Sequence, residues 1–67
     1  MEKTTIGARL RALRAAKGKT QEQVAKAIGV SVSSIAMYEL DERVPRDAVK
    51  VKIAKYFGKS ISAIFFT

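Results

Sequence analysis

Three glycines in this chain are each followed, two residues later, by a threonine or a serine. The three pairs are Gly18 and Thr20, Gly29 and Ser31, and Gly58 and Ser60. Glycine readily takes the left-handed conformation that ends a helix. A threonine or serine hydroxyl accepts a hydrogen bond from the free backbone N–H groups at the start of one. The pattern therefore predicts short helices separated by tight turns.

Apolar residues between these turns recur at three- and four-residue intervals, the period of a helix with one buried face. We predict helices from Thr4 or Thr5 to Gly18, from Thr20 to Gly29, from Val32 to about Leu40, from Pro45–Arg46 to Gly58 and from Ser60 to about Phe66. The residues expected in the core are Ile6, Leu10, Leu13, Val24, Ala25, Ile28, Ile35, Tyr38, Val49, Ile53, Ala54, Phe57, Ile64 and Phe65. No segment alternates as a strand would. The expected fold class is all-α, a compact bundle of five short helices in a single domain over residues 1–67.

The composition excludes several kinds of chemistry. The chain has no cysteine and no histidine. Disulfides, thiolate metal sites and the usual histidine ligands and proton shuttles are therefore excluded. We expect no enzyme activity, no metal and no cofactor.

The charge balance points to a polyanionic partner. Lysine and arginine total 13 against 6 acidic residues, a net charge of +7. This excess favours nucleic acid first and an anionic membrane surface second, with simple solubility as the alternative. The basic residues are spread over three of the predicted helices and the turns between them rather than along one amphipathic face, which argues against membrane activity. No apolar run approaches the roughly 20 residues that span a bilayer, and no signal peptide is visible. We expect a cytoplasmic protein without a membrane partner.

The second and third predicted helices are separated by only a three-residue turn. Such a turn sets two helices at about 90–120° to each other, as in a helix-turn-helix unit. Ala25 is small enough for close helix packing, Gly29 supplies the turn, and Val30 fills the corner between the helices. Ile35 anchors the third helix to the core. Its outer face then carries Ser33, Ser34, Ala36 and Met37.

These positions resemble a known family. The pattern Gln21-x-x-x-Ala25-x-x-x-Gly29-Val30-x-x-x-x-Ile35-x-x-x-Glu39, followed by Pro45 and Gly58-x-Ser60, resembles the phage-repressor and Cro type of DNA-binding domain, the xenobiotic-response-element family. The resemblance covers about Ile6 to Phe65. It implies a five-helix fold of the lambda-repressor-like type and a sequence-specific transcriptional regulator of double-stranded DNA, with repression the expected mode. The third helix would enter the major groove.

The resemblance also implies roles for individual residues. Base edges would be read by Val32, Ser33 and Met37. Phosphates would be bound by Gln21, Ser31, Ser34, Arg43 and Arg46. Arg14 and Glu39 would form an ion pair that orients the third helix, as in some relatives.

Two departures from the family pattern change the expectation. Leu40-Asp41 stands where a glycine is usual, so Asp41 would have to take the left-handed conformation. Val32, Ala36 and Met37 offer no hydrogen-bond donors, so we expect contacts with thymine methyl groups rather than bidentate polar readout. A protein–protein adaptor on the same fold remains the alternative, and the salt dependence of DNA binding would distinguish the two.

The C-terminal residues suggest self-association. Relatives often form dimers through the last helix, and Ile61, Ile64, Phe65 and Phe66 exceed what one short helix needs for packing. We therefore expect a homodimer on a palindromic operator within the bacterial nucleoid. The domain fills the chain, so we expect no small-molecule effector domain.

Overall fold

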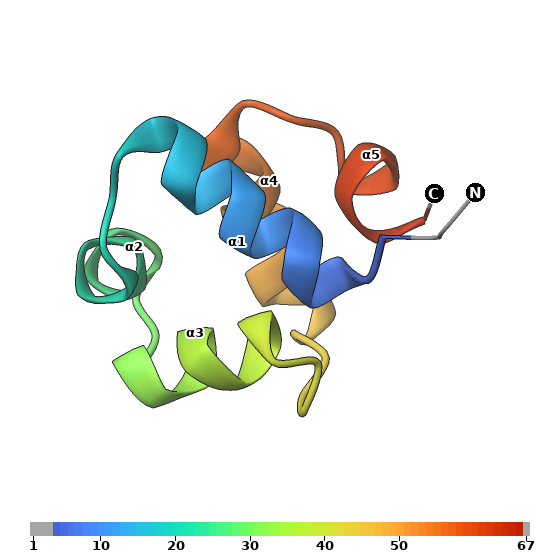
Figure 1. The fold of residues 1–67 in the computed structure, drawn as a ribbon. Coiled ribbons are helices and arrows are strands. Elements are labelled where there is room, and N and C mark those ends of the chain that lie inside the picture. The colour runs from blue at the N-terminus through green and yellow to red at the C-terminus, as the bar shows by residue number, and fades with distance from the viewer. Residues whose placement is uncertain (1–3, 67) are drawn as a thin grey trace.

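The computed structural model describes residues 4–66, which form five α-helices and no strand. The helices are α1 (Ile6–Lys17), α2 (Gln21–Ile28), α3 (Val32–Glu39), α4 (Asp47–Phe57) and α5 (Ile61–Phe65) (Figure 1). The predicted all-α class and the order of the five helices are confirmed. The outer ends of the predicted domain, residues 1–3 and 67, lie outside the described residues.

Most helix boundaries follow from local capping. Hydroxyl groups accept from backbone N–H groups at the starts of four helices, from Thr5, Thr20, Ser31 and Ser60. Left-handed glycines end three helices, namely Gly18, Gly29 and Gly58. The start of α4, predicted near Pro45–Arg46, lies at Asp47, with the extended Arg46 as its N-cap residue. The Arg46 side chain makes no cap hydrogen bond, and Pro45 is buried.

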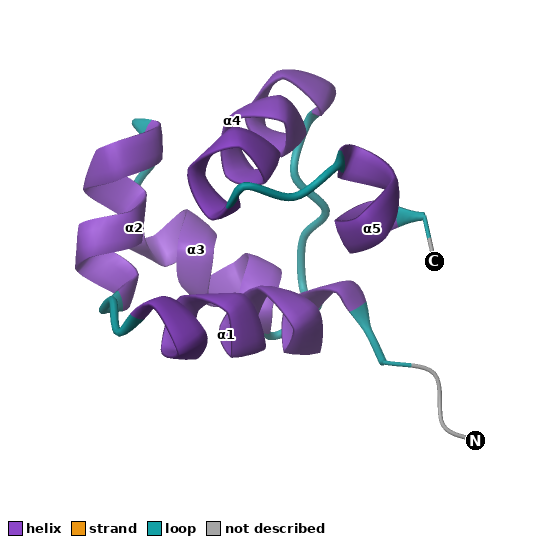
Figure 2. Cartoon of the chain, turned by 90° about the horizontal axis from the view of Figure 1, so that it is seen from above, coloured by secondary structure: helices purple, strands orange, loops and turns teal. Residues whose placement is uncertain are grey.

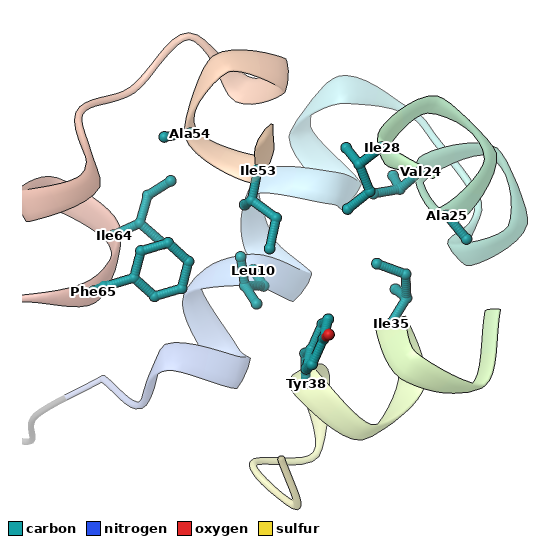
Figure 3. Packing of buried hydrophobic residues seen from close by; sticks show 10 residues of the cluster. All are labelled: Leu10, Val24, Ala25, Ile28, Ile35, Tyr38, Ile53, Ala54, Ile64 and Phe65. Atoms are coloured by element: carbon teal, nitrogen blue, oxygen red, sulfur yellow. The ribbon is translucent and has the colours of Figure 1, made fainter. Parts of the chain in front are cut away.

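The core is formed by one face of every helix. Its buried apolar members are Leu10, Val24, Ala25, Ile28, Ile35, Tyr38, Ile53, Ala54, Ile64 and Phe65 (Figure 3). Ile6, Leu13, Val49 and Phe57 were also predicted to face inward; they are partly buried and pack against this cluster. The helical period thus predicted the inner faces correctly, because a short amphipathic helix must bury its apolar stripe.

The helices leave α3 at one edge of the molecule. Figure 1 shows α3 along the lower edge, with the C-terminal ends of α1 and α4 at the opposite edge. Seen from above in Figure 2, α2 lies at one end and α5 at the other, with α1 and α4 between them. One side of α3 therefore packs on the bundle while the other faces outward.

The N-terminal turn of α1 packs directly on the end of α3. A Cβ atom added to Gly7 would lie 2.5 Å from the Glu39 carbonyl oxygen and 2.7 Å from that of Tyr38. Asp41 takes the expected left-handed conformation, with φ of 60°. Its Oδ1 accepts a hydrogen bond of 2.8 Å from the Gly7 N–H. The chain leaving α3 is thereby held against the start of α1.

Candidate nucleic-acid interface

The helix-turn-helix unit consists of α2, the residues Gly29 to Ser31, and α3. Val30 is half-buried against the core, as the sequence predicts. On α3, the buried residues are Ile35, Tyr38 and Glu39. The N-terminal half of α3 faces outward. It presents a short, solvent-accessible surface on a helix that is fixed from behind.

The three predicted base-reading residues differ in exposure. Ser33 is exposed, 42% of Val32 is exposed, and Met37 is half-buried. The Val32 and Met37 surfaces are apolar, and the Ser33 hydroxyl is the one hydrogen-bonding group among the three side chains. The exposed part of α3 is thus poor in donors, as the sequence indicates.

Ser31 and Ser34 form a local cap at the start of α3. The Ser31 Oγ accepts from the Ser34 N–H at 3.1 Å, and it donates to the Ser34 Oγ at 3.0 Å. Ser31 is exposed and Ser34 is half-buried. Both hydroxyls therefore stabilise the helix start, and their predicted contact with phosphate stays a prediction.

A buried carboxylate connects α3 to α1 and α2. The Arg14 Nε and Nη2 donate to the Glu39 carboxylate at 2.6 Å and 3.0 Å. The Gln21 Nε2 donates to the same carboxylate at 3.1 Å. The Glu39 side chain is only 3% exposed. The ion pair expected from the family resemblance is present and has a third member, Gln21, that sequence reasoning did not place there.

Hydrogen bonds and the neighbouring positive charge together outweigh burial in setting the pKa of Glu39. Burial alone would raise the pKa of Glu39, but hydrogen bonds from Arg14 and Gln21 and the positive charge of Arg14 lower it below its ordinary value. The hydrogen bond to Glu39 raises the pKa of Arg14, against the opposite effect of its burial. Both groups therefore remain charged in the folded protein.

The Gln21 amide is held in one orientation by this network. One N–H of the Nε2 group is used by Glu39, and an amide nitrogen carries a second. Reversing the amide would place its oxygen against a carboxylate. The second N–H is the donor left for the predicted phosphate contact.

Arg43 and Arg46 border a surface hollow of about 540 Å³ beside the C-terminal half of α3. Its other lining residues are Ser34, Tyr38, Val44 and Val49. Both arginines are exposed. The two salt bridges formed within residues 4–66 are Arg14–Glu39 and Lys50–Asp47, so neither of these arginine charges is neutralised there. Three of the predicted phosphate-binding residues, Ser34, Arg43 and Arg46, thus come together.

The predicted dimer residues do not form one surface. Ile64 is 1% exposed and Phe65 is 7% exposed, so both lie in the core of the single chain and cannot face a partner. The prediction is wrong for these two residues, because α5 must bury them to close the core against α1 and α4. Ile61 is half-buried, and Phe66 is 70% exposed.

Residues 4–66 contain no cluster of three potential metal ligands. None of the described helices is long and apolar enough to cross a membrane.

A short turn between two crossed helices, with the second exposed at its N-terminal half, defines a helix-turn-helix DNA-binding protein. A sequence model of the family described as Helix-turn-helix matches residues 10–64. The chain therefore belongs to the helix-turn-helix family, in its xenobiotic-response-element type, and is a DNA-binding transcriptional regulator. The family and fold are those of DNA-binding regulators and not of enzymes.

Individual proteins agree with this assignment. The chain is 47% identical over 49 residues to the uncharacterized HTH-type transcriptional regulator YazB of Bacillus subtilis (strain 168), covering 73% of this chain and 71% of that protein. The P22 c2 repressor, in complex with synthetic operator 9T in the presence of Tl+, matches with a TM-score of 0.92 and 25% identity over 96% of this chain and 97% of its own. A transcriptional regulator from Listeria innocua shows the same fold, with a TM-score of 0.87 and 24% identity over 94% of this chain and 59% of its own.

Proposed function

We propose that this regulator is a repressor that binds a palindromic operator as a homodimer, with α3 in the major groove. Residues 1–67 act as one DNA-binding domain, in the cytoplasm and on the bacterial nucleoid. The observation that carries the proposal is the exposed N-terminal half of α3, held from behind by Glu39 and flanked by two unneutralised arginines. The similarity to the P22 c2 repressor, solved in complex with a synthetic operator, supports it.

The chemistry of α3 determines what it reads. Val32 and Met37 present apolar surface, and the distinctive apolar group in the major groove is the thymine methyl. Ser33 discriminates little, because a hydroxyl both donates and accepts. We therefore place T·A pairs beneath Val32 and Met37, with further specificity from the shape of the duplex.

Phosphate contacts position the domain on the duplex. The Gln21 amide contacts the backbone beside the start of α2, with Ser31 at the start of α3. Arg43 and Arg46 bind the backbone at the hollow that they share with Ser34. Glu39 and Arg14 touch no base; they hold α3 at the angle that these contacts require.

The dimer forms through the surface that α5 leaves exposed. Phe66 is its largest apolar residue, and its ring lies 5.4 Å from the Lys50 Nζ on α4. A two-fold axis through Phe66, with Ile61 at the margin, would cover the exposed ring in each copy. The half-sites would then lie about 34–36 Å apart.

Selection of bound sequences from a random duplex pool, at two salt concentrations, tests this function. We expect a palindromic consensus and a binding constant that falls steeply with salt, by about 0.9 log units per log unit of salt for each neutralised phosphate. Failure to enrich any sequence at either salt concentration would reject operator binding and would favour the adaptor alternative.

Replacement of single thymines by uracil tests the readout, because it removes only the methyl group. We expect a loss of about 0.8 kcal/mol at each thymine that contacts Val32 or Met37. Met37→Gln should shift preference toward adenine, whose N6 and N7 a glutamine amide can bind. Uracil without effect at every half-site position would reject methyl recognition.

A further inference from the structure

Tyr38 belongs both to the core and to the surface. It is only 6% exposed and is a member of the buried cluster on the side of α3 (Figure 3). It also lines the hollow of about 540 Å³ bordered by Arg43 and Arg46. Its position on α3 predicts Tyr38 as a core residue alone, because the helical period carries no information about the loop that completes the hollow.

The Tyr38 hydroxyl is free to bind a ligand. None of the side-chain hydrogen bonds formed within residues 4–66 involves it. Within the same residues, no side-chain nitrogen or oxygen is both fully buried and without a hydrogen bond. The hydroxyl oxygen is therefore reached by solvent, although the ring is packed among apolar side chains.

The hollow has the chemistry of a phosphate site. Ser34 lies one helical turn before Tyr38 on the same face of α3. Arg43 and Arg46 contribute two exposed guanidinium groups without an ion-pair partner in the described chain. Charged guanidinium groups beside neutral hydroxyl donors are the usual ligands of DNA phosphates.

We propose that the Tyr38 hydroxyl donates a hydrogen bond to a backbone phosphate of the bound DNA, in the hollow that it shares with Arg43 and Arg46. The inference rests on the proposed function and adds a phosphate-binding residue to it. Packing already fixes the ring, so Tyr38 loses little conformational entropy when the contact forms. The same side chain thereby couples the position of α3 in the core to its register on the duplex.

Tyr38→Phe tests the proposal because it removes only the hydroxyl and keeps the ring. We expect an unchanged melting temperature and an affinity about three- to tenfold weaker, the value of one neutral hydrogen bond. Consensus and random duplexes should be affected alike, and the salt slope should not change, since no charge is lost. Tyr56→Phe is the matched control: Tyr56 is a half-buried tyrosine in the last turn of α4, and this end of the helix lies at the edge opposite α3 (Figure 1).

The outcomes separate this inference from the proposed function. DNA binding by the wild-type protein with no difference between it and Tyr38→Phe would overturn the inference alone. Absence of operator binding by the wild-type protein would instead overturn the proposed function.

Neutral methylphosphonate groups, placed one at a time along a half-site, locate the contact. The loss of affinity caused by Tyr38→Phe should be smaller on the duplex that carries the methylphosphonate at one particular position. The loss caused by Arg46→Ala should be smaller on that same duplex. A penalty of unchanged size at every modified position would show that the hydroxyl acts through the fold rather than on a phosphate, and would reject the proposal. Free inorganic phosphate should compete with the duplex no better than chloride at the same ionic strength, because the site is formed to hold phosphate within a duplex.

Discussion

The Arg14 guanidinium and the Glu39 carboxylate form a two-point ion pair, with the Nε–Oε2 distance at 2.6 Å, that joins α1 to the last residue of α3. The Arg14 Nη1 also donates to the Lys19 carbonyl at 3.0 Å, at the turn leading into α2. Arg14 thus bridges three helices around one buried carboxylate. The orientation of the recognition helix α3 depends on this contact and on the packing of Gly7.

Glu39→Gln should destabilise the fold and weaken operator binding. The substitution leaves the Arg14 charge without its partner, and breaking one side of a buried pair costs about 3 kcal/mol. Arg14 retains some solvent contact, with 19% of its side chain exposed, which reduces the loss. Thermal unfolding and a binding titration measure both effects. Wild-type melting together with wild-type affinity would show that the pair does not orient α3.

The stability contributed by Glu39 should depend on pH in one direction. Its pKa in the folded protein is lowered from the ordinary value of 4.5. The contribution is therefore fully present above that ordinary value and is lost as the pH falls through the lower, folded value. The difference in melting temperature between the wild-type protein and Glu39→Gln should shrink as the pH is lowered below 4.5. A difference that grows on acidification would contradict this assignment.

Gly7→Ala should destabilise the protein, although alanine is the better helix former. The gain in helix propensity is at most about 1 kcal/mol. The added methyl would meet the Glu39 and Tyr38 carbonyl oxygens at 2.5 Å and 2.7 Å, and neither can move without shifting α3. Overpacking of this kind costs about 1–3 kcal/mol, so the clash should decide the sign. Ala8→Gly, at the exposed next position, is the control and should lose only the propensity term; a more stable Gly7→Ala protein would refute the close contact.

Arg43→Ala and Arg46→Ala should each weaken binding to all duplexes about equally. Each change removes one neutralised phosphate, so the salt slope should fall by about one unit. Gln21→Ala should weaken binding without altering the slope, because the amide is neutral. Lys52→Ala, an exposed cation on α4 that borders neither α3 nor the Arg43–Arg46 hollow, is the charge control. An arginine variant that changes base preference but keeps the wild-type slope would place that residue on a base.

Phe66→Asp should convert the dimer to a monomer. Phe66 is 70% exposed in the single chain, so its substitution should leave the core and the melting temperature nearly unchanged. A carboxylate at the two-fold axis would face its own copy and oppose association. Sedimentation velocity and operator affinity give the readout, with Ala27→Asp at an exposed position of α2 as a control for added charge. Unchanged sedimentation in Phe66→Asp would exclude this interface.

The helix boundaries, the inner faces and the helix-turn-helix spacing could be predicted from the sequence because each depends on local signals. Thr20 begins α2 through hydrogen bonds with Gln23, and Gly29 ends it by taking the left-handed conformation. Both signals act within a few residues. The helical period alone then places Ile35 on the buried face and Ser33 on the exposed face of α3. The start of α4 was predicted near Pro45–Arg46, and Arg46 is the N-cap residue that directly precedes it.

Tertiary structure decided the features that depend on residues distant in the chain. The Asp41 carboxylate accepts from the Gly7 N–H across 34 positions of sequence. Nothing in the sequence around Gly7 indicates that this glycine makes a contact with a distant residue. The neighbouring aromatics Phe65 and Phe66 are equally apolar, yet only the placement of α1 and α4 determines that the first is buried and the second exposed. Tyr38 could be assigned to the core from its helical position, whereas its place in the lining of the hollow depends on the loop that carries Arg43 and Arg46. Local hydrogen bonds and periodicity operate within one helix, but burial and the formation of a site require several helices to meet.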